Sequence, residues 1–167
     1  MLGAYHSINF DDIRKQYQDS GTRYAFDVLD EKILTGYLIK LAAFRHLRDL
    51  QRVGDADFHY HYSAKECHKI LKFASIAPNV DTGVPVPLMD WQKFIFCMLF
   101  GWRDESNLKR FDRCILSVAR GQGKTYLMAI YMCYTYLIES MGLSNQDYLV
   151  TAENADQTGK LFGYISS

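Results

Sequence analysis

Apolar residues in the first half of the chain recur at helical spacing. In residues 36–53 they fall every three or four positions, at Ile39, Ala43, Leu47, Leu50 and Val53, which places them on one face of a helix. The first half of this segment is apolar on more than one side, so we expect it to pack between neighbours. Ser63 and Glu66 have the spacing of a capping box and predict a second helix that runs to about Ala77.

A proline-rich segment interrupts this pattern. All three prolines of the chain, together with Gly83, lie in residues 78–88. Proline lacks the backbone N–H that helices and sheets need, and such clusters mark loops and linkers. We therefore place a boundary here, between a helical N-terminal region at residues 1–84 and a second domain at residues 85–167.

The second domain has the pattern of an α/β protein. Residues 90–101 predict a helix, and the apolar run CILSVA at 114–119 has the length of a buried parallel strand. A glycine-containing loop follows, then an apolar helix to about Met141, a second strand at 148–152 and a last helical segment. The order strand, loop, helix, strand, helix predicts the start of a parallel sheet.

Composition narrows the possible functions. Of the 167 residues 49% are apolar, enough to build a core, and 19 basic side chains balance 19 acidic ones. This balance argues against a protein that coats nucleic acid through its overall charge. The four cysteines form no C-x-x-C motif, and we expect reduced, buried thiols. Without a secretory signal or a membrane-length apolar run, we expect a soluble cytoplasmic protein.

The loop SVARGQGKT at 117–125 indicates a phosphate-binding site. Such a site needs a strand that aims the backbone, glycines that let successive N–H groups turn toward an anion, and a helix N-terminus. The backbone amides of Gly121, Gln122, Gly123 and Lys124 would cradle the phosphates. Lys124 would reach the β- and γ-phosphates, and the Thr125 hydroxyl would bind Mg²⁺.

Two residues of this loop need separate consideration. The usual pattern has glycine where this chain has Val118; the first glycine mainly eases the bend out of the strand, so its loss is tolerable. Arg120 could reach the γ-phosphate and stabilise charge during catalysis. It could equally be a surface arginine paired with Asp112 or Glu153.

Four blocks, in order along the chain, extend the pattern beyond this loop. They are FRHLRDLQR (44–52), PVPLMDWQKFIFCMLFGW (85–102), KRFDRCILSVARGQGKT (109–125) and YLVTAENADQTGKLF (148–162). Together they resemble the large subunits of tailed-bacteriophage terminases, ATP-driven motors that package viral DNA into proheads. A loop without the first glycine is usual in that family, so Val118 agrees with the resemblance.

The resemblance implies more than the residues alone. It implies a P-loop ATPase domain of the ASCE type that uses ATP and Mg²⁺, with Gln92 contacting adenine and Trp91 or Phe94 supporting the base. It also implies double-stranded DNA, a small terminase subunit and a portal protein as partners, a homo-oligomeric ring, no membrane, and the cytoplasm of a bacterial host.

The family pattern also continues past what this chain contains. Terminases have a later apolar strand ending in Asp-Glu, whose carboxylates hold Mg²⁺ and activate water, and then an endonuclease domain; no such Asp-Glu strand occurs here. We therefore expect an incomplete ATPase domain that is inactive by itself. The alternatives are a non-catalytic interaction module, a prophage remnant or, less favoured, a small P-loop kinase.

Overall fold

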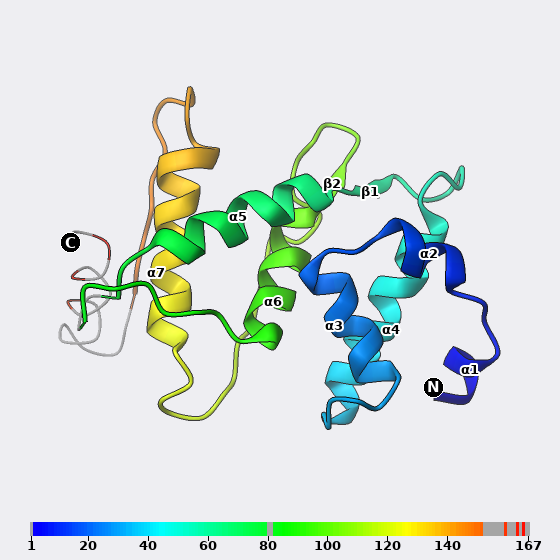
Figure 1. Cartoon of the computed structure of the whole chain (residues 1–167). Coiled ribbons are helices and arrows are strands. Elements are labelled where there is room, and N and C mark those ends of the chain that lie inside the picture. The colour runs from blue at the N-terminus through cyan, green and yellow to red at the C-terminus, as the bar shows by residue number, and fades with distance from the viewer. Residues whose placement is uncertain (1, 80–81, 152–158, 160–162, 164, 166–167) are drawn as a thin grey trace. The chain divides into compact units, whose positions relative to one another are not determined.

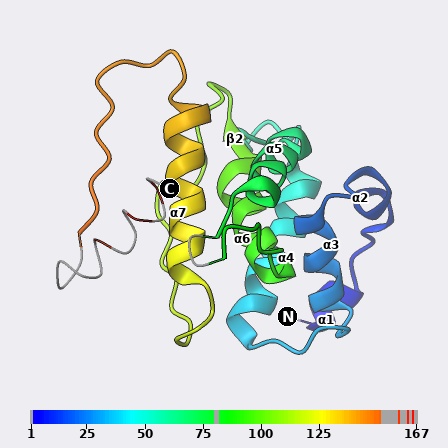
Figure 2. The ribbon, with the colours of Figure 1, turned by 60° about the vertical axis from the view of Figure 1, so that its left-hand side comes forward.

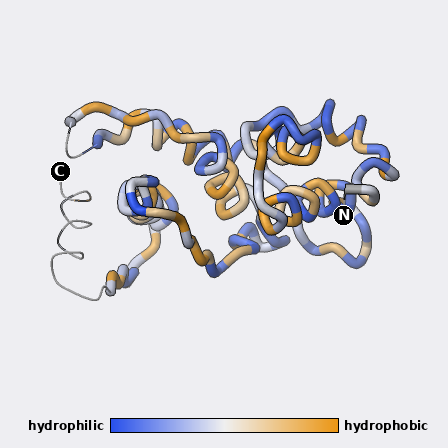
Figure 3. Tube along the Cα trace, turned by 90° about the horizontal axis from the view of Figure 1, so that it is seen from below, coloured by the Kyte–Doolittle hydropathy of each residue, from blue (hydrophilic) through white to orange (hydrophobic). Residues whose placement is uncertain are grey.

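The computed structural model describes residues 2–79, 82–151, 159, 163 and 165 (Figure 1). The named elements of this part of the chain are α1 (Leu2–His6), α2 (Asp11–Gln16), α3 (Ser20–Leu29), α4 (Tyr37–Arg52), β1 (Tyr60–Tyr62), α5 (Ala64–Ile76), α6 (Asp90–Gly101), β2 (Trp102–Asp104), α7 (Lys124–Tyr134) and the π-helical turn η1 (Thr135–Glu139). Hydrophobic and hydrophilic residues are interspersed along the trace (Figure 3). No helix among the described residues is both long and apolar enough to cross a bilayer.

The chain comprises two compact units. Unit 1 contains Met1–Leu71 and Met89–Cys114, and unit 2 contains Lys72–Leu88 and Ile115–Ser167. Helix α5 contributes residues to both units. The predicted domain boundary between residues 84 and 85 stays a prediction.

The helices predicted from the hydrophobic pattern are present. Helix α4 occupies the predicted segment 36–53, and α6 has the predicted bounds. Helix α5 begins directly after Ser63, whose side-chain oxygen accepts the backbone N–H of Glu66 at 3.3 Å, as the capping-box spacing predicts. The helix expected after residue 124 is also formed and continues through η1.

The predicted parallel strands are not formed in the described part of the chain. Residues 114–119 and 148–151 have no strand partner there, and residue 152 and most of the helix predicted after it lie outside the described residues. The two named strands, β1 and β2, instead pair antiparallel, with Tyr60 opposite Asp104 and Tyr62 opposite Trp102. The expectation of strands at 114–119 and 148–151 was therefore wrong for this structure, because an apolar run becomes a strand only when a neighbour supplies the hydrogen-bond ladder.

Helix α3 is the centre of unit 1 and packs against both α4 and α6 (Figures 1 and 2). The contact with α6 depends on Gly21. A Cβ atom at this position would lie 2.5 Å from the Cβ of Cys97, closer than two carbon atoms can approach. Glycine therefore lets the two helices come close together, and the apolar face of α3, including Ala25, Val28 and Leu29, is fully buried.

A chain of buried hydrogen bonds connects β2, α4 and the start of α3. Trp102 donates its indole N–H to Nδ1 of His46 at 3.1 Å. This makes Nδ1 the acceptor, so the proton of the neutral ring is on Nε2, which lies 3.0 Å from the Thr22 hydroxyl. Thr22 in turn donates to Oδ2 of Asp19 at 2.7 Å. Every polar group in this series is paired, which is the condition for burying it without a large penalty.

A second polar anchor attaches the segment after β2 to α4. The guanidinium of Arg110 donates to Oδ2 of Asp49 at 2.7 Å, and both side chains are largely buried. The same guanidinium lies over the rings of Tyr60 and Trp102, 4.6 and 5.1 Å from their centroids. Removing one partner of such a pair leaves a buried charge unpaired, which costs far more than the pair itself contributes.

His46 makes unit 1 sensitive to acid. Burial, reinforced by the positive charges of Arg45 and Arg110 and opposed by Asp19, lowers the pKa of His46 from 6.5 to about 3. Protonation therefore favours the unfolded chain: stability is complete above pH 6.5 and falls as the pH drops toward 3. Between pH 6.5 and 5 we expect His46 to cost about 2 kcal/mol of unfolding free energy.

Urea unfolding followed by tryptophan fluorescence measures this loss, because both tryptophans, Trp91 and Trp102, belong to unit 1. His46→Gln retains hydrogen-bonding capacity but does not titrate, so the difference between its pH dependence and that of the wild type isolates His46. Equal slopes for the two proteins would refute a neutral buried His46.

Candidate nucleotide-binding site

The loop before α7 turns through two left-handed glycines. Gly121 has a φ angle of +79° and Gly123 one of +74°, and Gly123 is the N-cap of α7. Positive φ is the conformation in which a side chain is penalised and glycine is not. The backbone thereby enters α7 with the N–H groups of its first turn at the loop, as anion binding requires.

The structure explains why valine is acceptable at position 118. Among the described residues the non-glycine positions with positive φ are Glu31, Asn107 and Asn145, so Val118 adopts an ordinary backbone conformation. A glycine is therefore not needed at this point. What the loop uses from Val118 is its carbonyl oxygen, which any residue provides.

Lys124 ties the two ends of the loop together. Its Nζ donates to the carbonyl oxygen of Val118 at 2.6 Å and to that of Ala119 at 2.8 Å. An ammonium group has three N–H donors, so two close the loop and one is left for an additional acceptor. The sequence could not reveal these contacts, since both acceptors are backbone atoms.

Thr125 and Arg120 are exposed at the same loop. Thr125 is in the first turn of α7. Arg120 has no ion-pair partner within the described residues; Asp112, one of the two partners considered from the sequence, lies 3.9 Å from Arg113. The other, Glu153, is outside the described residues. The exposed guanidinium at the loop is the arrangement that the catalytic interpretation needs, and it does not test that role.

Gln92 belongs to unit 1, whereas the loop belongs to unit 2. Its side chain is buried, and its Oε1 accepts the backbone N–H of Met89 at 2.9 Å. Gln92 thus completes the N-terminal hydrogen bonds of α6 as the third residue of a capping box. Phe94 is a core residue whose ring centroid lies 5.3 Å from that of Tyr24. The proposed adenine contact therefore remains a prediction.

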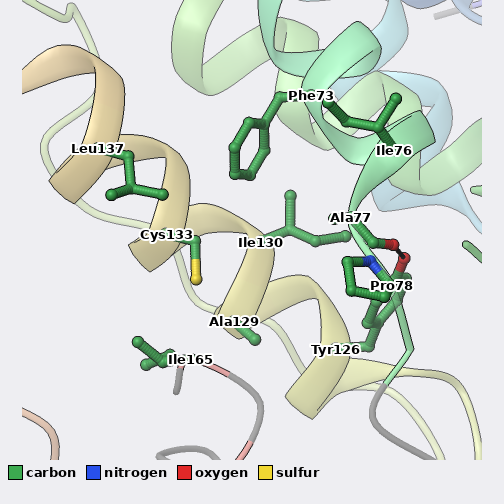
Figure 4. Close-up of a pocket in the computed structure, with 10 residues that line it drawn as sticks. All are labelled: Phe73, Ile76, Ala77, Pro78, Tyr126, Ala129, Ile130, Cys133, Leu137 and Ile165. Carbon is green, nitrogen blue, oxygen red and sulfur yellow. Dashed lines mark hydrogen bonds between the residues drawn. The ribbon is translucent and has the colours of Figure 1, made fainter. Parts of the chain in front are cut away.

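Helix α7 lines an apolar groove on a different part of unit 2 (Figure 4). The groove has a volume of about 260 Å³ and lies between α7 and the end of α5, where Phe73 and Ala77 face Tyr126 and Ile130. The Tyr126 hydroxyl closes one side by donating to the carbonyl of Ala77 at 2.9 Å. None of the residues 117–125 lines it, so it is separate from the phosphate loop.

A group of two buried thiols and one partly buried carboxylate was not expected from the sequence. Asp19, Cys67 and Cys97 have their ligand-type atoms within 4.8 Å of one another. The Cys67 thiol donates to the Tyr62 hydroxyl at 3.1 Å, which donates to Asp19 at 2.8 Å. The hydrogen bond with Cys67 and burial raise the pKa of Cys97 well above its usual value, so the protonated form of the Cys97 thiol is favoured. Cys67 and Cys97 are buried as predicted, but Cys114 is exposed, contrary to that expectation.

Comparison with known families bears directly on the loop-containing segment. Residues 90–167 match the family of the terminase large subunit, ATPase domain. The resemblance seen in the sequence is confirmed over this segment. The match covers a little less than half of the chain. It includes Trp91, Gln92 and the phosphate loop, but not the block at 44–52. Searches of curated proteins and of solved structures gave no match.

The loop geometry predicts different costs for substitutions at Gly121 and Val118. Gly121→Ala should destabilise the loop by about 1–2 kcal/mol, because alanine is penalised at a φ of +79°, although open space surrounds the position. Val118→Gly should cost no more than about 1 kcal/mol, the entropic cost of glycine. Thermal unfolding of unit 2 and amide exchange at residues 118–125 measure both effects. A larger penalty for Val118→Gly than for Gly121→Ala would contradict this account.

Proposed function

We propose that this chain binds ATP with Mg²⁺ through residues 117–125 as part of a terminase large subunit. The observation that carries the proposal is the loop closed by Lys124 across two left-handed glycines. The geometry leaves one ammonium N–H of Lys124 and the start of α7 for a phosphate group. The family match of residues 90–167 supports the same assignment.

Each proposed site residue has a distinct role. Gly121, Gln122, Gly123 and Lys124 present backbone amides to the phosphates, and the Lys124 side chain supplies positive charge. The Thr125 hydroxyl is a hard oxygen ligand of the kind that Mg²⁺ accepts. Arg120 stabilises charge on the terminal phosphate, and Gln92 contacts the adenine through its amide.

The wider role is the packaging of double-stranded viral DNA into proheads. In that setting we propose a homo-oligomeric ring in the cytoplasm of a bacterial host, with a small terminase subunit and a portal protein as partners and an endonuclease activity in the full-length enzyme. We propose nucleotide binding without sustained turnover for residues 1–167, because the sequence has no run of four apolar residues ending in Asp-Glu to hold Mg²⁺ and activate water.

A second candidate function is a protein-interaction module. It is favoured by large apolar side chains exposed on α4, among them Leu38, which belong to the part of the chain outside the family match. This function is compatible with nucleotide binding, since the two would use different elements.

Titration calorimetry with ATP and Mg²⁺ tests the nucleotide site. Replacing Lys124 with alanine removes both the loop tie and the charge on the phosphates, so Lys124→Ala should weaken binding by roughly 10- to 100-fold. Lys15→Ala, a lysine exposed on α2, is the control and should bind as the wild type does. Phosphate release measured on the same samples should stay at background. Unchanged affinity in Lys124→Ala would exclude the proposed site, and release that depends on Lys124 would refute the absence of turnover.

Base selectivity tests Gln92 separately. Gln92→Glu keeps an oxygen acceptor for the Met89 N–H, so α6 should remain capped, but it replaces the amide N–H₂ with a carboxylate oxygen. We expect the preference for ATP over GTP to fall by roughly tenfold or more, as when a designed hydrogen-bond pair is lost. If helix content is unchanged and the preference is also unchanged, Gln92 acts only as a cap.

A further inference from the structure

Helix α4, the cyan helix in Figure 1, carries large apolar side chains on its outward side. Leu38 is 75% exposed, Tyr37 65% and Leu41 43%. The opposite side of the helix is already packed, with Ala43, Leu47 and Leu50 in the core of unit 1. The outward side therefore contributes nothing to that core, although exposed apolar clusters of this kind mark interaction surfaces.

The same side continues as a basic stripe. Leu38, Leu41, Arg45 and Arg48 are spaced alternately by three and four residues, which is the spacing of a seam that receives another helix. We call these four residues and Tyr37 the outer face of α4. Its first half is apolar and its second half is cationic.

The two arginines of the outer face have no carboxylate partner within the described residues. Arg45 lies over the ring of Phe111, with 5.1 Å to the ring centroid, and Arg48 donates to the amide oxygen of Gln51 at 2.9 Å. Other cations of α4 are paired: Lys40 with Glu31 at 2.8 Å and Arg52 with Asp57 at 3.1 Å. Among the lysines and arginines of α4, those without a carboxylate partner in the described part of the chain are thus the two on the outer face.

We propose that the outer face of α4 docks an acidic amphipathic helix of a partner protein. The partner helix would place apolar side chains at three- and four-residue spacing against Leu38 and Leu41, and carboxylates in the next two turns against Arg45 and Arg48. Apolar contact gives affinity, and the charge pairs set register and reject basic partners.

The distribution of charge favours this occupant over two others. If two copies paired antiparallel along the whole face, the apolar half of each would meet the arginines of the other. A membrane-bound helix carries its cations beside the apolar face, along its full length, whereas Arg45 and Arg48 follow the apolar residues on the same line. A helix with consecutive apolar and acidic turns matches both halves.

Two designed helical peptides of equal length provide the probe for the full chain. Both carry leucines at three- and four-residue spacing in the first half; in the second half one has glutamates and the other lysines at the matching positions. Fluorescence anisotropy should show at least tenfold tighter binding of the glutamate peptide. The double variant Arg45→Glu/Arg48→Glu should reverse this preference, and Leu38→Ser/Leu41→Ser should weaken both peptides by tenfold or more.

Matched controls distinguish specific peptide binding at the outer face from nonspecific binding elsewhere on the protein. Arg113→Glu and Leu143→Ser alter an exposed cation and an exposed apolar residue elsewhere, and should leave both affinities unchanged. All substituted side chains are at least partly exposed, so circular dichroism should report unchanged helix content. Nucleotide binding does not enter this experiment, and its outcome is independent of the proposed ATP site.

Several outcomes would overturn the proposal. Equal affinity for the two peptides, or no reversal by the arginine variants, would remove the charge pairing on which it rests. A concentration-dependent dimer that Leu38→Ser/Leu41→Ser abolishes would identify a second copy as the occupant. Binding to vesicles of anionic lipid, lost in the same variant and without any peptide binding, would identify a membrane surface.

Discussion

The neutral state of His46 is the constraint on which unit 1 depends. The imidazole ring accepts from Trp102 on one side and donates to Thr22 on the other, so it joins β2 to the start of α3 through α4. A second proton would place two donors face to face at Nδ1 and put a charge in a fully buried position. The interior of unit 1 thus combines close helix packing at Gly21 with a polar connection that holds only in one protonation state.

In the phosphate loop, backbone groups provide the hydrogen bonds that side chains provide in the interior of unit 1. The ammonium group of Lys124 donates to two carbonyl oxygens, and these come from Val118 and Ala119 regardless of their side chains. Two glycines then take the conformations that other residues avoid. Position 118 is therefore free to vary, while Gly121, Gly123 and Lys124 carry the geometric demands of the loop.

The sequence predicted the helices well because each signal was local. The apolar repeat of α4, the capping residues of α5 and the apolar character of α7 depend on neighbours within a few positions. The antiparallel pairing of β1 with β2 joins segments about forty residues apart, and no local pattern predicts such a pairing. For residues 114–119 the sequence predicted a strand that is not formed. Their composition suits a strand, but a strand also needs a hydrogen-bonding partner, which composition cannot supply.

The site residues show the same difference between features that a local sequence pattern predicts and features that it does not. The glycines and Lys124 were recognisable from a short motif, whereas the Lys124 tie uses backbone acceptors and the Gln92 side chain caps its own helix. The resemblance to terminases was recognisable because several blocks kept their order, and the family match agrees for residues 90–167. A role for Gln92 at a base requires the placement of unit 1 against unit 2, which no local pattern encodes.

The π-helical turn η1 has a consequence for the helix that begins at the loop. Its bond from the Ser140 N–H to the Thr135 carbonyl spans five residues, one more than in an α-helix, so one extra residue is accommodated without a break. Each residue corresponds to about 100° of rotation. Side chains beyond Thr135 are therefore rotated relative to the line of Tyr126, Ile130 and Tyr134, which are buried. Tyr136 is largely exposed, whereas Leu137 still lines the apolar groove. The continuous helix formed by α7 and η1 thus presents two surfaces that point in different directions.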